Sequence, residues 1–324
     1  MQTFNYIEAR SIEEAVAALG RYEGRARLIA GGTDLLGKMK DRVLPGYPEA
    51  LVNLKSIPGL TGIREEKGEL VIGALTRLAD VAAHPGVRAG WTALAEAARR
   101  TASPQLREMG TLGGNLCQDV RCWYYRHPDN RFPCLRKGGG RCYAIDGDNR
   151  YHAIFGGSVE QGCYAVHPSD TAPALVALDA RLVTSKRTLP AADFFTVGVS
   201  RTTALESDEI LTEVRLSAPP ASAKSAFIKF AIRRSIDFPI VNCAARVVSS
   251  NGRVSAARVC LNAVAVTPYR PKAAEETLVG AALTEASAEA AGEAAIRGAR
   301  PLEHNGYMVQ IARTLVKRAV LACA

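Results

Sequence analysis

Five of the eight cysteines in this sequence lie within residues 117–163, and four of them have the spacing Cys122-x11-Cys134-x7-Cys142-x20-Cys163. Four thiolates can bind a zinc ion or a [4Fe–4S] cluster, since both accept tetrahedrally arranged sulfur. Structural zinc sites usually contain paired C-x2-C knuckles, which this stretch lacks. The long irregular spacing and the interspersed aromatic residues therefore favour a shielded redox cluster over zinc or unligated core cysteines. On the residues alone, Cys117 could replace one of the four ligands.

The other three cysteines, Cys243, Cys260 and Cys323, stand in apolar surroundings and are expected to be small core residues. Residues 1–10 lack the basic and apolar regions of a secretory signal, so a disulfide framework is not expected. A cytoplasmic location is the default expectation, with a periplasmic one only if the chain is exported together with a partner. The sequence contains no apolar run of about 18 residues, so no transmembrane helix is expected.

A glycine-rich segment, Ala30-Gly-Gly-Thr-Asp34, follows a predicted buried strand and precedes a helical stretch at 35–42. Glycines let backbone N–H groups approach a ligand closely, and a helix N-terminus adds positive potential. The segment could therefore hold a diphosphate, although a plain strand-to-helix turn has the same pattern. Residues 32–38 fit G-x4-G-K, but Met39 stands where the phosphate loop of an ATPase needs Ser or Thr. No G-x-G-x-x-G follows a predicted strand, which argues against a Rossmann unit.

A second glycine element, Thr111-Leu-Gly-Gly-Asn115, follows the short segment 103–110. Two loops of small residues in one domain could bind opposite sides of a long cofactor. Each motif alone is compatible with a simple turn.

Short alternating strands and helices are expected to position these motifs. Strands are predicted at 26–30, 51–54, 62–64 and 70–72, and helices at 76–83, with Thr76 as its cap, and at 91–100. Residues 117–169 show little periodicity and are predicted to be an insert wrapped around a bound group. Regular structure resumes at 173–180, 181–184 and 209–216.

The C-terminal third indicates a small α+β domain. A linker is predicted at 218–225, followed by strands at 226–232, 240–249 and 253–265 and by helices at 272–279, 285–297 and 305–322. Asn251-Gly252 predicts a tight hairpin, because both central positions of such a turn need positive φ. Strands followed by helices predict an antiparallel sheet that is covered on one face.

The net charge of +9 raises the question of nucleic-acid binding. The basic residues are scattered, with only short groups such as Arg99-Arg100, and no RNA-binding signature accompanies them. Solubility, anionic cofactors and partner docking explain the charge better, so no nucleic-acid partner is expected.

The sequence resembles a known family, the FAD-binding medium subunits of the xanthine dehydrogenase and carbon monoxide dehydrogenase group. The resemblance covers essentially the whole chain. It rests on four stretches, IAGGTDL (29–35), TLGGN (111–115), HPSD (167–170) and K-x3-RR-x2-DF (229–238). It implies an α+β chain, with a two-lobed FAD-binding domain of the vanillyl-alcohol-oxidase-like type at 1–219 and a C-terminal domain at 220–324 like that of the carbon monoxide dehydrogenase flavoprotein.

By the same resemblance, the first motif holds the FAD diphosphate and the second motif continues the contact near the flavin. The cofactor contacts that it implies are Ile29, Ala30, Gly31, Gly32, Thr33, Asp34, Leu35, Thr101, Ala102, Thr111, Gly113, Gly114, Asn115, Asp170 and Lys229. Thr101 and Ala102 are expected near the isoalloxazine ring, and Asp170 and Lys229 are expected to make polar contacts to the cofactor.

Most members of the family pass almost directly from the second motif to the aspartate, whereas about fifty residues intervene here. This insert is similar to the one that carries a [4Fe–4S] cluster in the β subunit of 4-hydroxybenzoyl-CoA reductase, and it resembles the FAD subunit of periplasmic aldehyde oxidoreductases. Matching their order implies Cys122, Cys134, Cys142 and Cys163 as the cluster ligands and leaves Cys117 as a non-ligand.

The resemblance further implies a heteromeric oxidoreductase in which this chain transfers electrons and has no catalytic residues of its own. A large subunit would hold the molybdopterin cofactor and a small subunit two [2Fe–2S] clusters, and a dimer of such heterotrimers fits the family. The holoenzyme would be a 4-hydroxybenzoyl-CoA reductase-like enzyme or an aldehyde or aromatic dehydrogenase. The rival hypothesis is a zinc-stapled subunit that binds a nucleotide without electron transfer.

Overall fold

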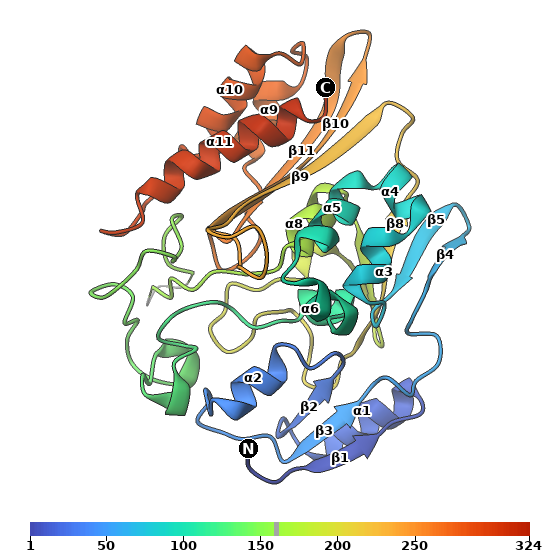
Figure 1. Cartoon of the computed structure of the whole chain (residues 1–324), viewed down its shortest axis with the longest axis vertical. Helices are drawn as coiled ribbons and strands as arrows, with labels where there is room; N and C mark the ends of the chain where they lie inside the picture. The colour runs from blue at the N-terminus through green and yellow to red at the C-terminus, as the bar shows by residue number, and fades with distance from the viewer. Residues whose placement is uncertain (159–161) are drawn as a thin grey trace.

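In the computed structural model, which describes residues 1–158 and 162–324, the sheets of the chain are stacked along its long axis (Figure 1). The N-terminal lobe, in blue, lies at one end and the C-terminal domain, in orange and red, at the other. A second lobe lies between them, and the cysteine-rich insert, in green, runs along one side. The two ends of the chain are therefore far apart.

The first lobe is built on a small parallel sheet with the strand order β1-β3-β2. Its elements are β1 (Asn5–Glu8), α1 (Ile12–Arg21), β2 (Ala26–Ile29), α2 (Leu35–Lys40) and β3 (Ala50–Asn53). Strand β3 is buried at every position, which agrees with its central place in the sheet. Because β2 ends at Ile29 and α2 begins at Leu35, the first glycine motif is the connection between them.

The second lobe contains a five-stranded antiparallel sheet with the order β4-β5-β8-β6-β7. Its strands are β4 (Ile63–Glu66), β5 (Glu69–Gly73), β6 (Arg181–Thr184), β7 (Thr188–Pro190) and β8 (Leu211–Ser217). Its helices are α3 (Leu78–Ala83), α4 (Pro85–Gly90), α5 (Thr92–Arg100), α6 (Pro104–Met109), α7 (Leu112–Leu116) and α8 (Thr171–Ala177), with a 3-10 turn η3 (Ala191–Asp193). The second glycine motif forms α7, with Thr111 as its cap.

The insert has little regular structure, as predicted. Its described residues contain only two 3-10 turns, η1 (Pro128–Asn130) and η2 (Leu135–Lys137). Aromatic side chains pack inside it, with Phe132 edge-on to Tyr124 and Tyr143. A segment with so few backbone hydrogen bonds of its own needs another source of order, which a bound metal centre could supply.

The C-terminal domain is an antiparallel sheet with the order β11-β10-β9 and three helices. Its elements are β9 (Ala223–Phe230), β10 (Val241–Ser250), β11 (Arg253–Asn262), α9 (Lys272–Leu278), α10 (Glu285–Ala295) and α11 (Tyr307–Leu321). Alternate residues of the sheet face in opposite directions, so Cys243 packs with the three helices while Ala244 and Cys260 pack with the second lobe. The expectation of one covered face was wrong, because α5 and α8 of the second lobe cover the other face.

Several local predictions can be checked directly. Asn251 and Gly252 have φ of 51° and 75°, so the predicted hairpin turn is confirmed. Thr76 does not cap α3, because its hydroxyl bonds to the backbone of Gly62 and Arg77 is the cap residue. The predicted linker at 218–225 was too long, since β9 already begins at Ala223. The three isolated cysteines are buried core residues, as expected.

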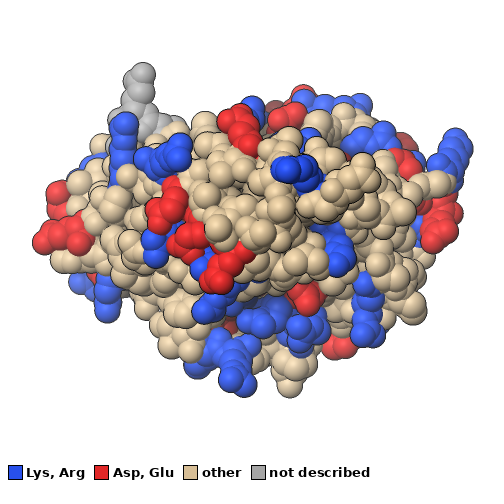
Figure 2. Space-filling view, turned by 90° about the horizontal axis from the view of Figure 1, so that it is seen from above, with Lys and Arg blue, Asp and Glu red and all other residues tan. Residues whose placement is uncertain are grey.

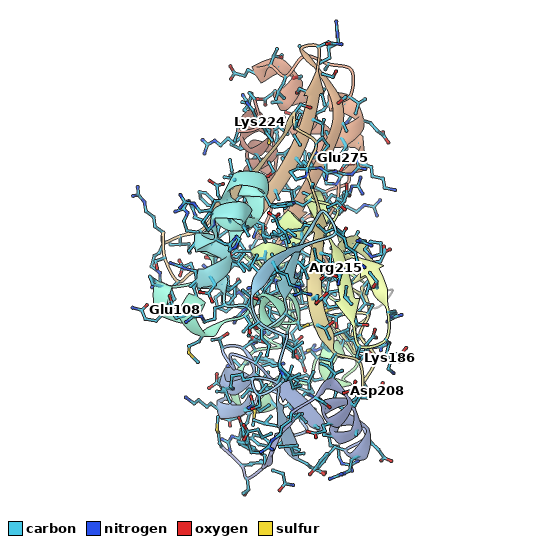
Figure 3. All side chains as sticks on the ribbon, turned by 90° about the vertical axis from the view of Figure 1, so that its right-hand side faces the viewer. Glu108, Lys186, Asp208, Arg215, Lys224 and Glu275 are labelled. Atoms are coloured by element: carbon cyan, nitrogen blue, oxygen red, sulfur yellow. The ribbon has the colours of Figure 1, made fainter. Side chains whose placement is uncertain are left out.

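Both signs of charge are present on the face that Figure 2 shows. Several Lys and Arg side chains gather near the lower centre of this view, a group of Asp and Glu side chains lies above them, and uncharged surface separates other charged groups. Figure 3 labels one oppositely charged pair, Lys186 and Asp208, on the part of the second lobe nearest the first lobe. Lys186 Nζ lies 2.6 Å from Asp208 Oδ1. In the described residues, no helix is long and apolar enough to cross a membrane.

Candidate functional site

A cleft of about 240 Å³ separates the first and second lobes, and both glycine motifs line it. All seven residues from Ile29 to Leu35 contribute to its wall, as do Thr111, Gly113 and Gly114 from the second motif. The two loops that the sequence places eighty residues apart are therefore brought together. Asn115, Thr101, Ala102, Asp170 and Lys229 lie outside this lining.

The first motif presents free backbone donors to the cleft. In the part of the chain that the structure describes, the N–H groups of Gly31, Gly32, Thr33 and Asp34 have no acceptor. Unpaired backbone donors next to a helix N-terminus favour an anion such as a diphosphate. The second motif differs, because the N–H of Gly113 donates to Ala74 O and the N–H of Gly114 donates to Thr111 Oγ1.

The glycines of the first motif are needed for reasons other than contact with a ligand. A Cβ on Gly31 would lie 1.9 Å from Met109 O, so this glycine lets the 109–110 backbone pass close by. Gly32 has a φ of +72°, and a Cβ there would meet the side chain of Leu36. Neither Cβ would point into open cleft, so these two glycines determine the path of the loop backbone.

Part of the cleft lining is apolar. It consists of leucine and isoleucine side chains from both lobes, Leu28, Leu54, Leu75, Leu205, Ile210 and Leu211, beside Arg27. An apolar slot next to an anion-binding loop fits a planar base joined to a diphosphate. The residues present therefore fit the adenosine diphosphate half of FAD.

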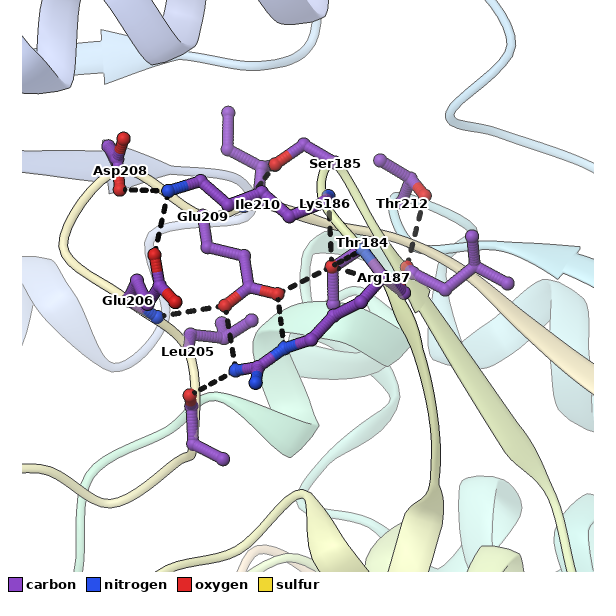
Figure 4. A network of polar contacts seen from close by, with 12 residues as sticks. Thr184, Ser185, Lys186, Arg187, Leu205, Glu206, Asp208, Glu209, Ile210 and Thr212 are labelled. Atoms are coloured by element: carbon purple, nitrogen blue, oxygen red, sulfur yellow. Dashed lines mark hydrogen bonds and ion pairs between the residues drawn. The ribbon is translucent and has the colours of Figure 1, made fainter.

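One wall of this slot is held by the network of Figure 4. The buried Glu209 carboxylate accepts hydrogen bonds from Thr184 Oγ1 at 2.6 Å, from Arg187 Nε at 3.0 Å and from the N–H of Glu206. Burial alone would raise the pKa of Glu209, but these donors hold it below its usual range. The network fixes the 205–211 segment that supplies three of the apolar wall residues.

The side chain of Asp34, a predicted cofactor contact, is paired within the protein, while its backbone N–H is one of the free donors of the first motif. Its carboxylate accepts from Arg126 Nη1 at 2.6 Å and from the N–H of Asp119 at 3.0 Å. Burial by itself would raise the pKa of Asp34, but Arg126 and then Lys38 lower it. Asp119 in turn pairs with Lys38 Nζ at 2.9 Å, and Lys38 lines the cleft. These four charges join the first motif to the start of the insert.

Thr101 and Ala102 end helix α5. Thr101 Oγ1 donates to Ala97 O within the helix, and Ala102 adopts a φ of +47°. The carbonyl of Ala102 accepts from the N–H of Ile236 in the β9–β10 loop. The structure therefore places this pair against the 231–240 loop, away from the diphosphate cleft.

Asp170 and Lys229 form a buried ion pair, with 2.7 Å between Asp170 Oδ2 and Lys229 Nζ. Asn242 Nδ2 donates to the other carboxylate oxygen at 2.7 Å, and Lys229 Nζ also donates to Arg100 O. Burial raises the pKa of Asp170, although Lys229 opposes this. The pair joins the HPSD stretch to strand β9, so both side chains already have partners within the protein.

We expect Lys229→Met to lower the free energy of unfolding by about 3 kcal/mol, because it leaves the Asp170 carboxylate buried without its cation. Urea unfolding at pH 7 measures the change. Lys186→Met, which breaks two exposed pairs, with Glu206 and Asp208, is the control and should have a much smaller effect. Equal losses of unfolding free energy in the two variants would show that the buried pair contributes no more to stability than the exposed pairs.

Asn115, a predicted site residue, belongs to the same buried polar network, together with Thr171, Asn242 and Asn262, which were not predicted. Asn115 Oδ1 accepts from Ser169 Oγ at 2.5 Å and from Thr171 Oγ1 at 2.6 Å, which joins the second glycine motif to the HPSD stretch. Asn262 Nδ2 donates to Ser169 O at 2.6 Å. Asn242 and Asn262 face each other on β10 and β11. A pair of asparagines at matching buried positions in two strands was a signal that could have identified them.

The four predicted cluster ligands come together in the insert. Cys122, Cys134, Cys142 and Cys163 line one small cavity, together with Tyr124, Tyr125 and Tyr143. Cys117 lies elsewhere, in the lining of the diphosphate cleft. All eight cysteines are free thiols.

The thiols around this cavity affect one another's ionisation. Burial, with smaller contributions from the neighbouring Cys142 and Cys134, raises the pKa of Cys122 to about 12. Burial also raises the pKa of Cys134 and of Cys142, with Cys163 adding to both. Buried thiols with raised pKa values become thiolates readily only if a positive centre compensates them, so the donor set fits a bound metal group.

A single metal ion and a four-iron cluster need different spacings of their ligands. Within residues 1–158 and 162–324, no three His, Cys, Asp or Glu side chains are grouped so that they could hold one ion. A tetrahedral zinc ion at about 2.3 Å from each sulfur draws its four ligands close together. The ligands of a four-iron cube can stand farther apart, because each binds a different iron atom.

Comparison with known proteins covers the whole chain. The family model described as the FAD binding domain in molybdopterin dehydrogenase matches residues 2–219, and the one described as the CO dehydrogenase flavoprotein C-terminal domain matches residues 226–323. The carbon monoxide dehydrogenase medium chain of Hydrogenophaga pseudoflava is 33% identical over 323 residues, which span 98% of this chain and 96% of that protein. The aldehyde oxidoreductase FAD-binding subunit PaoB of Escherichia coli K12 is 34% identical over 325 residues, with 97% and 96% covered.

Solved structures agree with these relatives. The structure of carbon monoxide dehydrogenase from Hydrogenophaga pseudoflava that lacks the Mo-pyranopterin moiety superposes with a TM-score of 0.78 at 32% identity, covering 99% of this chain and 97% of that one. The expected fold, a two-lobed FAD-binding part followed by an α+β C-terminal part with an antiparallel sheet, is confirmed.

Proposed function

Because the chain belongs to the family of FAD-binding medium subunits of the molybdenum hydroxylases, we propose that it is an electron-transfer subunit carrying a [4Fe–4S] cluster beside its FAD. The single observation that supports the cluster is the convergence of Cys122, Cys134, Cys142 and Cys163 on one cavity. These cysteines come from points spread over forty residues of irregular chain, so chance packing is a poor explanation for their meeting.

For FAD, the proposed diphosphate contacts are the free N–H groups from Gly31 to Asp34, and the proposed adenine site is the apolar slot beside them. The flavin end is proposed to lie toward Thr101, Ala102, Asn115, Asp170 and Lys229. Asp170 and Lys229 would then act by fixing the backbone around the ring, since their charges are already paired. When bound, FAD and the cluster supply the one- and two-electron redox chemistry.

The partners are proposed from the family. A large subunit would hold the molybdopterin cofactor and the substrate, and a small subunit would hold two [2Fe–2S] clusters. The named relatives include a carbon monoxide dehydrogenase and an aldehyde oxidoreductase. We propose a holoenzyme of the aldehyde or aromatic dehydrogenase or 4-hydroxybenzoyl-CoA reductase type, with electrons passing between the partner clusters, this chain and an external donor or acceptor.

A second candidate is a zinc-stapled subunit that binds a nucleotide without a redox role. The four cysteine thiols would serve zinc as well as iron chemically. The absence, in the described residues, of a group that could hold a single ion speaks against it. A visible flavin spectrum with iron in place of zinc would exclude this candidate.

We expect the isolated chain, expressed without partners, to show no turnover of aldehyde or aromatic substrates, because the substrate would bind to another subunit. Adding the partner subunits should restore electron transfer from substrate to an artificial acceptor. An assay of substrate-dependent dye reduction measures both. Turnover by the single chain, free of molybdenum, would contradict the proposed function.

A further inference from the structure

A histidine lies directly against one of the four cysteines. Nε2 of His152 is 3.2 Å from Sγ of Cys122, and the imidazole is fully buried. Nδ1 of the same ring has no hydrogen-bond partner among the described residues. His152 does not line the cysteine cavity but lines a cleft of about 680 Å³ on the other side of Cys122. The imidazole therefore contacts the sulfur of Cys122 from outside the cysteine cavity.

The geometry decides which ring nitrogen carries the useful proton. A neutral imidazole has one N–H, and placing it on Nδ1 would bury a donor without an acceptor. Placing it on Nε2 lets it donate to Cys122 Sγ. A protonated imidazole carries both N–H groups, so Nε2 is a donor toward the sulfur in that state too.

The position of His152 is fixed from two sides. The backbone N–H of His152 donates to Asn149 O at 3.1 Å, and the backbone carbonyl of His152 accepts from Asn305 Nδ2 at 2.9 Å. Asn149 Oδ1 also accepts from the N–H of His304. Asn149 and Asn305 are buried, and Asn305 lies just before α11 of the C-terminal domain. These hydrogen bonds fix the backbone of His152, and the buried imidazole is therefore held beside Cys122.

We propose that His152 is a positioning residue that donates an Nε2–H hydrogen bond to Cys122 Sγ and so raises the reduction potential of the cluster. The inference rests on the proposed function, since Cys122 must be a cluster ligand. One-electron reduction adds negative charge to the cluster and its sulfur ligands. A donor aimed at a ligand sulfur stabilises the reduced state more than the oxidised one, and hydrogen bonds to the sulfurs are among the factors that set such potentials.

The test is a potentiometric titration of the anaerobically purified complex, followed by the paramagnetic signal of the reduced cluster. His152→Leu removes the donor, and His152→Gln keeps an amide N–H near the position of Nε2. We expect the Leu variant to retain its iron and to favour the oxidised state about tenfold more than the unmodified complex. For one electron this is a fall of about 59 mV in midpoint potential. The Gln variant should recover at least half of the shift.

Iron retained by the Leu variant at an unchanged midpoint would overturn the proposal. If the Leu variant loses its iron, the unmodified complex supplies the second readout: after 15N labelling of histidine, a ring nitrogen should couple to the reduced cluster, which separates His152 from the backbone N–H groups around the same sulfurs. Finding no such coupling would overturn the proposal as well. An unmodified complex without a cluster in this chain is a different result, because it refutes the proposed function and not the hydrogen bond.

Discussion

Replacing Cys134 with serine should remove nearly all the iron held by this chain, from about four atoms to close to none. Cys134 is buried and is one of the four thiols around the cavity in the insert. Serine has a weak oxygen donor in place of a thiolate, and a cluster with three good ligands is readily lost. Iron analysis of anaerobically purified complexes measures the difference, and the paramagnetic signal of this cluster should disappear with the iron.

Cys117→Ser is the matched control. Cys117 lies in the lining of the diphosphate cleft, apart from the other four thiols, so its loss should leave the iron in place. Iron loss from the Cys117 variant but not from a Cys163 variant would contradict the assignment of ligands. The Cys134 variant should also be cleaved faster within residues 117–169 while its flavin absorption remains, because the insert has few backbone contacts of its own.

Replacing Gly31 with alanine should reduce the FAD that remains bound after gel filtration to less than about a tenth of the original amount. The new Cβ would stand 1.9 Å from Met109 O, so the 30–34 loop and the 109–110 backbone must move apart. A shift of this kind costs about 1–3 kcal/mol and misaligns the free N–H groups of the loop, and each 1.4 kcal/mol lost from binding weakens it about tenfold. Flavin absorbance relative to protein measures the result.

Gly37→Ala is the control for this variant. Gly37 lies in α2, a few residues after the motif, and a Cβ there meets nothing within 4 Å. Alanine also has a higher helix propensity than glycine, so the fold should not suffer. Full FAD retention by a folded Gly31→Ala protein would contradict the assignment of the diphosphate cleft.

The candidate site could be predicted from sequence where residue type and order carry the information. Four cysteines in a stretch without periodicity can be recognised without knowing the surrounding fold. The structure brings all four to one cavity. The two glycine motifs likewise meet in one cleft. In both cases the function needs particular residues in a particular order, which a sequence shows directly.

Long-range polar partners could not be predicted in the same way. Asp34 belongs to the first motif, yet its carboxylate pairs with Arg126, far along the chain in the insert. Lys229 and Asp170 were predicted as cofactor contacts, and their pairing with each other was not predicted. A motif shows that a charged residue is present, whereas its partner depends on which segments pack together.

Local structure was predicted correctly where it depends on neighbouring residues and missed where it depends on tertiary contacts. The Asn251-Gly252 turn is set by local backbone geometry and was predicted correctly. Thr76 looked like a helix cap, but a tertiary contact with Gly62 takes its hydroxyl. The second covered face of the C-terminal sheet follows from the docking of α5 and α8, which local patterns do not encode.

The most direct test of the account is the content of metal and flavin in the anaerobically purified, unmodified complex. The account predicts one FAD for each copy of this chain. It also predicts about eight irons per heterotrimer, four in the two [2Fe–2S] clusters of the small subunit and four held by Cys122, Cys134, Cys142 and Cys163. Only about four irons, or one zinc for each copy of this chain in place of the additional iron, would contradict it.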